Sequence, residues 1–276
     1  MSHEEALAAF RQWDVVPPLT RLPTLNPTAI GGTAHVTHLI TAQGETGERL
    51  FILRKHRDDS AALGFSQLHQ ASCMREAARH QLAPMPVWQS SVGHEMVMEH
   101  VAASGQPDPE DLAVLMKSIH RLPLVGPQLD IAARIDQYRQ VALKRGVPSE
   151  LLLRGDLKDI QQRLTSLNEG PIVMCHNDLH PDNMVKNDTQ LLALDWEYAA
   201  PGSPYFDAAA AVAGWPKIPV EPFLIRVLGE GYCRRRWREA QCLYRVVSWN
   251  WHWAAGYTPG DAEDVQKIRA TVAGLA

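Results

Sequence analysis

The segment from His176 to Ala199, HNDLHPDNMVKNDTQLLALDWEYA, decides how the rest of the chain is interpreted. It contains four aspartates, two histidines, three asparagines and one glutamate, separated by short apolar runs. Such runs are typical of short buried strands. Because MVKNDTQLLAL has turn-forming residues between two of them, we predict a β-hairpin that turns at Asn187–Asp188.

A hairpin with this turn brings two potential metal ligands together. It places Asn183 opposite Leu192 or Ala193, with Asp195 two or three residues further along. At about 3.3 Å per residue and about 4.8 Å between strands, the backbones at Asn183 and Asp195 lie within roughly 10 Å of each other. An amide oxygen and a carboxylate are hard ligands that suit Mg²⁺. We therefore predict a magnesium site at these two residues.

A third acidic side chain stands close to this pair in the sequence. Asp178 lies five residues before Asn183, on the loop that enters the hairpin. There it can orient a hydroxyl group toward a phosphorus atom held by the metal. Phosphoryl transfer depends mainly on such positioning and on charge neutralisation. The pattern therefore predicts a phosphate-transfer site.

A zinc site formed by His176, Asp178 and His180 is the alternative interpretation. Histidines four residues apart share one face of a helix, as zinc proteases require. However, Pro181 opposes a continuing helix, and Asn177 occupies the position where a metalloprotease needs a glutamate. We therefore favour the phosphate-transfer site.

The composition limits the class of protein. The chain has 276 residues, 45% of them hydrophobic, and a net charge of -4, which argues against a general nucleic-acid binder. No apolar run approaches the roughly 18 residues of a membrane span. The four cysteines form no C-x-x-C pair, so we expect reduced thiols. Because the first residues lack the pattern of a secretory signal, we expect a cytoplasmic protein that binds neither nucleic acid nor membrane.

The order of predicted elements indicates an α+β protein with two parts. Residues 29–54 form strands joined by a glycine-containing turn, residues 65–84 a helix, and residues 94–101 a further strand. Helical patterns dominate after this strand. The segment VAASGQPDP is the best candidate linker. We therefore predict two domains, an N-terminal one of residues 1–101 and a helical one of residues 102–276.

Two motifs carry a resemblance to a known family. HNDLHPDN at residues 176–183 matches H-x-D-x-x-x-x-N, and LDWEYA supplies Asp195 where protein kinases have D-F-G. The combination resembles the aminoglycoside phosphotransferase and choline kinase superfamily, and it is most similar to bacterial choline, ethanolamine or thiamine kinases. This resemblance implies a protein-kinase-like fold. A small antiparallel β-sheet lobe with one main helix, residues 1–101, would bind the nucleotide, and a larger, mostly helical lobe, residues 102–276, would be the catalytic and substrate-binding lobe. It also implies ATP and Mg²⁺ as cofactors.

The resemblance assigns further residues to nucleotide binding. Gly31 and Gly32 fit the glycine-bearing hairpin that covers the phosphates. The neighbours Arg54 and Lys55 point to opposite faces of a strand, so only one of them can enter the cleft. In choline and thiamine kinases this strand commonly has apolar residues followed by arginine, so the resemblance implies that Arg54 holds the phosphates and that Lys55 lies in solvent. Glu76 resembles the helix glutamate that pairs with this cation. The backbone groups expected to meet adenine are those near Glu99 and Val101.

Two residues around the catalytic motif are expected to be structural. His176 is expected to pack and hydrogen-bond within the loop, as in the family. Asp207 resembles the aspartate that braces the catalytic loop. As an N-terminal helix residue, it can also cap the alanine-rich helix that follows.

The acceptor pocket is expected to recognise a cation. By resemblance, Glu197 favours choline, ethanolamine and thiamine kinases over aminoglycoside kinases, and Tyr198 lies where choline kinases present an aromatic ring. Trp249 and Trp253 lie in the segment that completes an aromatic cage. Indole faces attract a cation by about 0.5 to 2 kcal/mol each. Because Trp249 and Trp253 share one helix face and Trp251 points away, core packing is an equal alternative.

The working hypothesis is an ATP- and Mg²⁺-dependent kinase with Asp178 as the catalytic residue. It transfers the γ-phosphoryl group to the hydroxyl of a small cationic alcohol such as choline or ethanolamine. Thiamine and aminoglycosides are alternative acceptors. A pseudokinase-like binding module is the non-enzyme alternative, but such modules usually lose a metal ligand or the catalytic aspartate, and here all are present. The absence of an A-P-E-like segment argues against a protein kinase.

Overall fold

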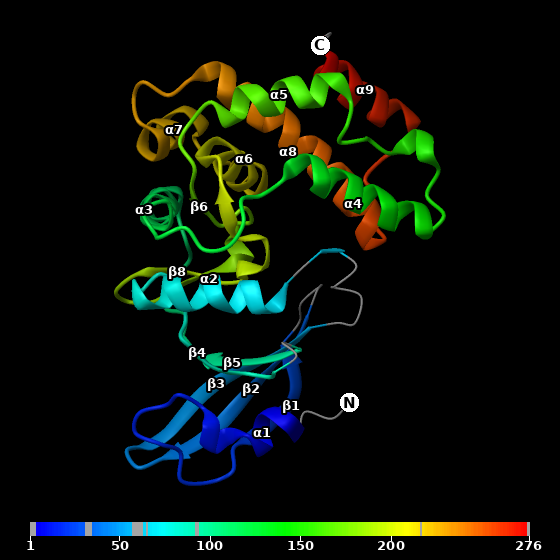
Figure 1. Ribbon diagram of the computed structural model, residues 1–276. Coiled ribbons are helices and arrows are strands. Elements are labelled where there is room, and N and C mark those ends of the chain that lie inside the picture. Colours follow the sequence, from blue (N-terminus) through cyan, green and yellow to red (C-terminus); the bar gives the residue numbers. More distant parts are fainter. Residues whose placement is uncertain are drawn as a thin grey trace. The chain divides into compact units, whose positions relative to one another are not determined.

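The computed structural model describes residues 4–30, 35–56, 63–64, 66–91, 94–215 and 217–274. The chain forms two compact units (Figure 1). The first unit consists of Met1–Ala61, Phe65–Pro107 and Asp182–Glu197, and the second of Ala62–Gly64, Asp108–Pro181 and Tyr198–Ala276. In the described part of the chain, no helix combines the length and the apolar character that crossing a membrane requires.

The first unit is built on a five-stranded antiparallel sheet with the strand order β1-β2-β3-β5-β4. Its strands are β1 (Thr24–Ile30), β2 (His35–Gly44), β3 (Gly47–His56), β4 (Pro86–Gln89) and β5 (Glu95–Glu99). The hairpin of β2 and β3 closes at the pair Gly44 and Gly47. Gly47 has a φ of +122°, which residues with a Cβ rarely adopt, so this turn requires glycine.

Helices and a compact core complete the first unit. The helical segments are α1 (Glu4–Ala8), the short 3-10 helix η1 (Phe10–Gln12) and α2 (Gln67–Arg79). α2 begins after Ser66, whose side chain accepts a hydrogen bond from the N–H of His69 at 3.3 Å. In the core, Trp13 packs edge-on against Phe51 of β3, with ring centroids 5.3 Å apart.

A second, two-stranded sheet belongs to the first unit although it lies far along the chain. Its strands are β7 (Met184–Lys186) and β8 (Leu191–Ala193), flanked by the short helices η4 (Pro181–Asn183) and η5 (Trp196–Tyr198). The N–H of Ser104 donates to the carbonyl of Lys186, and the N–H of Ala193 donates to the carbonyl of Leu82, each at 2.9 Å. Through these backbone bonds, residues 182–197 belong to the first unit, whereas the expected boundary at residue 101 places them in the second.

The second unit is mostly helical. Its elements are α3 (Pro109–Ile119), α4 (Ile131–Lys144), η3 (Ser149–Leu151), α5 (Lys158–Asn168), β6 (Val173–Cys175), β9 (Ala200–Gly202), α6 (Pro204–Gly214), α7 (Val220–Leu228), α8 (Arg234–Ala255) and α9 (Ala262–Ala273). α8 is 22 residues long and packs against α4, α5, α6 and α9 (Figure 1). The small sheet-based unit and the larger helical unit confirm the predicted α+β class.

A buried amide joins α8 to two neighbouring segments. Asn250 has no exposed surface, and its Oδ1 accepts a hydrogen bond from the N–H of Leu153 at 3.1 Å. Its Nδ2 donates to the carbonyls of Leu153 at 2.7 Å and Ile135 at 3.2 Å. Because buried polar groups are costly without partners, this side chain fixes α8 against α4 and against the segment that follows η3.

We expect Asn250→Leu to lower the free energy of unfolding by about 3 kcal/mol, because it leaves the N–H and the carbonyl of Leu153 buried without their partner. Urea denaturation followed by tryptophan fluorescence measures this change. Gln162→Leu on the exposed face of α5 is the control and is expected to stay within about 0.5 kcal/mol of the parent protein. A loss below about 1 kcal/mol for Asn250→Leu would contradict the assigned role.

Candidate active site

The hairpin of β7 and β8 aligns Asn183 and Asp195 at its open end. Met184 pairs with Ala193, so Asn183 lies level with Leu194, and the N–H of Leu194 donates to the carbonyl of Asn183 at 2.8 Å. The predicted turn is present, but the predicted register was one or two residues short. The observed register brings the two expected metal ligands to adjacent positions across the hairpin.

The side chain of Asn187 explains this register. Its Oδ1 accepts hydrogen bonds from the N–H groups of Thr189 at 3.0 Å and Gln190 at 2.9 Å. The N–H of Asn187 donates to the carbonyl of Gln190 at 3.0 Å. An asparagine that bonds to the backbone two and three residues ahead mimics a backbone turn, so it closes a four-residue turn at this point.

An ion pair connects the sheet to the open end of this hairpin. Arg54 of β3 is 5% exposed, and its Nη2 lies 2.5 Å from Oδ1 of Asp195. Asp195 has a φ of +55°, the left-handed conformation that costs a non-glycine residue of order 1–3 kcal/mol. Such strain is often found at functional sites, where the surroundings hold the residue in place. The structure therefore unites Arg54 and Asp195 in one buried, charged arrangement.

Among the ion pairs of the described residues, Arg54 pairs with Asp195 and not with the predicted partner Glu76. Glu76 on α2 instead pairs with Arg79 at 2.9 Å and with His80 at 3.3 Å. Residues three and four positions apart lie on the same helix face, so these local partners compete for the Glu76 carboxylate. Lys55 is half-buried, whereas it was expected in solvent.

Two other predicted nucleotide contacts lie at the end of β5. The N–H of Glu99 donates to the carbonyl of Met85 at 3.0 Å, and its carboxylate lies 3.4 Å from Arg49. Within the described residues, the N–H of Val101 makes no hydrogen bond, which leaves it available to a ligand. The two predicted phosphate-loop glycines, Gly31 and Gly32, lie outside the described residues.

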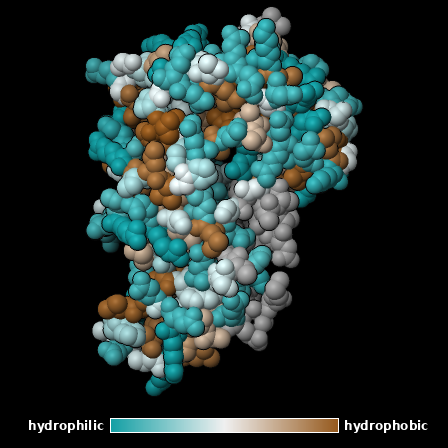
Figure 2. Space-filling model, in the orientation of Figure 1, coloured by the Kyte–Doolittle hydropathy of each residue, from teal (hydrophilic) through white to brown (hydrophobic). Residues whose placement is uncertain are grey.

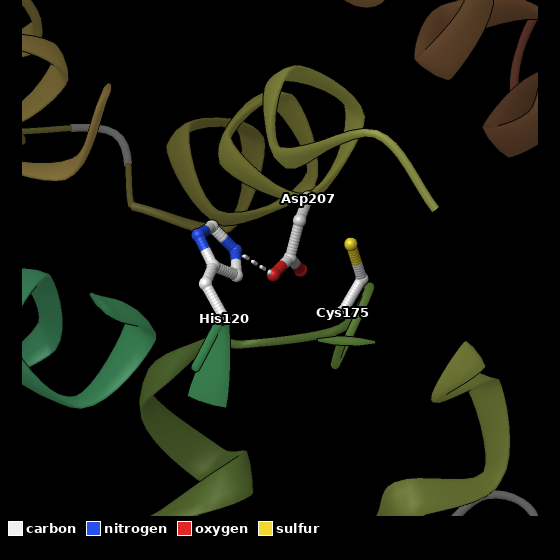
Figure 3. Close-up of side chains that lie close together, drawn as sticks. All are labelled: His120, Cys175 and Asp207. Atoms are coloured by element: carbon white, nitrogen blue, oxygen red, sulfur yellow. Dashed lines mark hydrogen bonds and ion pairs between the residues drawn. The ribbon is translucent and has the colours of Figure 1, made fainter. Parts of the chain in front are cut away.

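In the second unit, a buried carboxylate holds the start of the HNDLHPDN motif. Asp207 of α6 has no exposed surface, and its Oδ1 accepts from the N–H of Asn177 at 2.6 Å. Its Oδ2 accepts from the N–H of His176 at 3.4 Å and lies 2.8 Å from Nε2 of His120 (Figure 3). Asp207 therefore braces the loop that begins at His176. It does not cap α6 as its N-terminal residue, because the N-cap position is Ser203.

Asn177 adopts the left-handed conformation as well, with a φ of +65°. Asparagine tolerates this conformation better than most residues. Its Nδ2 donates to the carbonyl of Tyr198 at 3.0 Å, which connects the loop to the segment after LDWE. The backbone N–H and the side-chain amide of Asn177 are thus both held by hydrogen bonds.

Asp178, the predicted catalytic residue, is 28% exposed at its side chain. Its Oδ2 lies 3.7 Å from Nε2 of His180. Burial raises the pKa of Tyr244 on α8 to about 12, and the negative charge of Asp178 adds to this rise. A Cβ on Gly214 at the end of α6 would lie 2.7 Å from Cβ of His180, so this close approach requires glycine. The loop that carries Asp178 is therefore held by α6 and lies close to α8.

His120 and Cys175 were not predicted as part of this region. Figure 3 shows both beside Asp207, with ligand atoms of the three residues within 4.8 Å of one another. Burial, and next the charge of Asp207, raise the pKa of the Cys175 thiol well above its usual value, so it stays protonated. Because the Asp207 oxygens already accept hydrogen bonds from N–H groups, we interpret this cluster as a structural brace and not as a metal site.

The predicted acceptor residues are all buried or half-buried. Trp249 is 6% exposed, and its Nε1 donates to the carbonyl of Leu151 at 2.7 Å. It packs edge-on against the half-buried Trp253, with ring centroids 6.5 Å apart. Trp249 is thus a core residue. In the segment WEY, Glu197 is buried and Tyr198 is half-buried.

Comparison with known proteins decides the family. A model of the phosphotransferase enzyme family matches residues 41–243. The chain belongs to this family. The phosphotransferase is 28% identical to the thiamine kinase of Salmonella typhi over 223 residues, which cover 79% of this chain and 72% of that protein. The family predicted from the two motifs is confirmed, and with it the expectation of an enzyme that phosphorylates a small-molecule hydroxyl.

Solved structures share the fold of the phosphotransferase. The choline kinase of Streptococcus pneumoniae has a TM-score of 0.69 at 14% identity, and the match covers 99% of this chain and 100% of that chain. A structure of the same choline kinase in complex with AMP has a TM-score of 0.66 at 14% identity, with full coverage of both chains. At this level of identity, the likeness establishes the fold, which is the one predicted.

We expect Asp207→Asn to lower the free energy of unfolding of the phosphotransferase by about 2 kcal/mol, because the amide turns an NH₂ group toward a backbone N–H and loses a charge-assisted hydrogen bond. Urea denaturation measures the loss, and amide hydrogen exchange at Asn177 is expected to become faster. Asp159→Asn, at an exposed position of α5, is the control. Unchanged exchange at Asn177 would contradict the bracing role.

Proposed function

We propose that this phosphotransferase transfers the γ-phosphoryl group of ATP to the hydroxyl of a small cationic alcohol, with Mg²⁺ as the metal. The observation that supports the proposal is the hydrogen bond from the N–H of Leu194 to the carbonyl of Asn183, because it brings the backbones of Asn183 and Asp195 to neighbouring positions across the hairpin. An amide oxygen and a carboxylate oxygen are the hard donors that Mg²⁺ prefers.

Each charged residue has a role in this proposal. Asn183 and Asp195 would hold the metal, which when bound supplies positive charge that neutralises phosphate oxygens. Arg54, whose guanidinium lies against Asp195, holds phosphate oxygens of the nucleotide. Asp178 orients the acceptor hydroxyl and accepts its proton. The N–H of Val101 is the proposed contact to adenine.

Thiamine is the first candidate for the acceptor. It carries a primary hydroxyl and a thiazolium cation, and the relatives that align with this chain over 72% of their length are named thiamine kinases. Choline and ethanolamine come second, supported by the LDWEYA motif and by the fold likeness to a choline kinase. Because Trp249 packs in the core, Glu197, Tyr198 and Trp253 remain the proposed contacts to the cation.

We expect Asp178→Asn to reduce kcat by a factor of about 10³ or more, because the variant keeps the shape of the side chain but cannot accept a proton. Steady-state release of ADP measures the rate, and fluorescence titration with a nucleotide analogue measures affinity, which is expected to change by less than about threefold. Asp188→Asn, in the exposed turn of the same hairpin, removes an equal charge and is expected to keep full activity. Full activity of Asp178→Asn would refute the assigned role.

A screen of acceptors tests the substrate class. Thiamine, choline, ethanolamine and an aminoglycoside are each added with ATP and Mg²⁺, and ADP release is compared with the rate without acceptor. We expect the largest stimulation from thiamine, and a neutral alcohol of similar size is expected to be at least about tenfold poorer because it lacks the cation. Stimulation by the aminoglycoside alone would overturn the acceptor class. No ADP release with any acceptor would favour a binding module.

A further inference from the structure

A cavity in the second unit lies apart from the residues of the proposed reaction. Its volume is about 350 Å³, and it is bounded by α3, β6, α6, α7 and α8. This is the lower end of the size range of small-molecule sites. On the surface of this unit, Figure 2 shows hydrophobic side chains gathered over α3 and α7, where Val114 and Ile225 are exposed.

The charged lining of the cavity has a single sign. Lys117, Arg121 and Arg236 line it together with His120, and none of its lining residues is acidic. Within the described residues, Lys117 and Arg121 take part in no ion pair. Arg236 lies 3.9 Å from the Glu169 carboxylate, so the uncompensated charge of the lining comes from Lys117 and Arg121, which raise the local potential and attract anions.

Arg236 adds a directional donor to this lining. Its side chain is 23% exposed. Its Nη2 donates to the carbonyl of Glu169 at 3.2 Å, while the Glu169 carboxylate lies nearer to Arg235, at 2.7 Å, than to Arg236, at 3.9 Å. A guanidinium presents N–H groups in a planar arrangement that fits phosphate or carboxylate oxygens.

The remaining wall of the cavity is apolar. Pro204 at the start of α6 and Val227 and Leu228 at the end of α7 contribute to it. The hydroxyl of Tyr205, a further lining residue, accepts a hydrogen bond from the N–H of Cys233 at 2.8 Å, so its own proton is left to donate. The cavity thus combines a cationic side with an apolar side, which suits a ligand of the same two-sided character.

We propose that this cavity binds a small organic anion. Its phosphate or carboxylate head group contacts Arg236, Lys117 and Arg121, and its apolar body lies against Pro204 and Val227. This site goes beyond the proposed function and does not depend on it, since none of these residues takes part in the proposed reaction. One wall, His120, is also the side chain that bonds to Asp207, so the ligand lies next to the brace of the catalytic loop.

Isothermal titration calorimetry on the full chain tests the site with three probes: benzoate, phenyl phosphate and benzamide. Each is titrated at constant ionic strength in the presence of saturating ADP and Mg²⁺. We expect benzoate or phenyl phosphate to bind with one-to-one stoichiometry, and the tighter of the two identifies the head group. Benzamide, which has the shape of benzoate without its charge, is expected to bind at least about tenfold more weakly. Equal binding of benzoate and benzamide, or no binding of either anion, would overturn the proposal.

Variants locate the bound anion. The double variant Lys117→Gln/Arg121→Gln and the single variant Arg236→Gln are each expected to weaken anion binding at least about tenfold. Arg238→Gln, at an exposed position of α8 that does not line the cavity, is the matched control and is expected to bind as the parent protein does. Unchanged affinity in both cavity variants would show that the anion binds elsewhere. Thermal melting checks that each variant is folded. If a variant does not fold, the comparison of the three probes on the parent protein still tests the proposal.

Discussion

The conformation of the loop that begins at His176 depends on the hydrogen bonds that the buried carboxylate of Asp207 accepts. A buried negative charge is costly unless hydrogen bonds compensate it, and here three N–H donors do so. Two of these donors are consecutive backbone groups, at His176 and Asn177, so the carboxylate fixes the path of the chain itself. This explains how Asn177 keeps its left-handed conformation and why the backbone at the next residue, Asp178, has a defined position.

Local patterns in the sequence were sufficient to predict much of the fold and part of the site. The glycine turn between β2 and β3 and the turn at Asn187 each depend on residues within a few positions of one another. The neighbouring positions of Asn183 and Asp195 across the hairpin follow from the second turn, and the kinase-like spacing of the motif led to the family. The error of one or two positions in the register arose because the Asn187 side chain closes a four-residue turn.

Other parts of the site depend on contacts that spacing cannot reveal. His120 reaches Asp207 across 87 positions, and it follows an ordinary amphipathic helix without any signal of its own. Glu76 resembles a family residue, yet its neighbours Arg79 and His80 compete for its carboxylate. The core position of Trp249 became evident from its bond to the Leu151 carbonyl. Residues 182–197 joined the first unit through backbone bonds to distant segments, which no local pattern encodes.

The membership of β7 and β8 in the first unit has a practical consequence for dividing the gene. A recombinant fragment that ended at Pro107 would leave the carbonyl of Leu82 and the N–H of Ser104 without their partners. The complementary fragment would carry an orphaned hairpin. Chimaeras made by exchanging halves between relatives therefore need to transplant residues 182–197 together with the N-terminal part, as a discontinuous module.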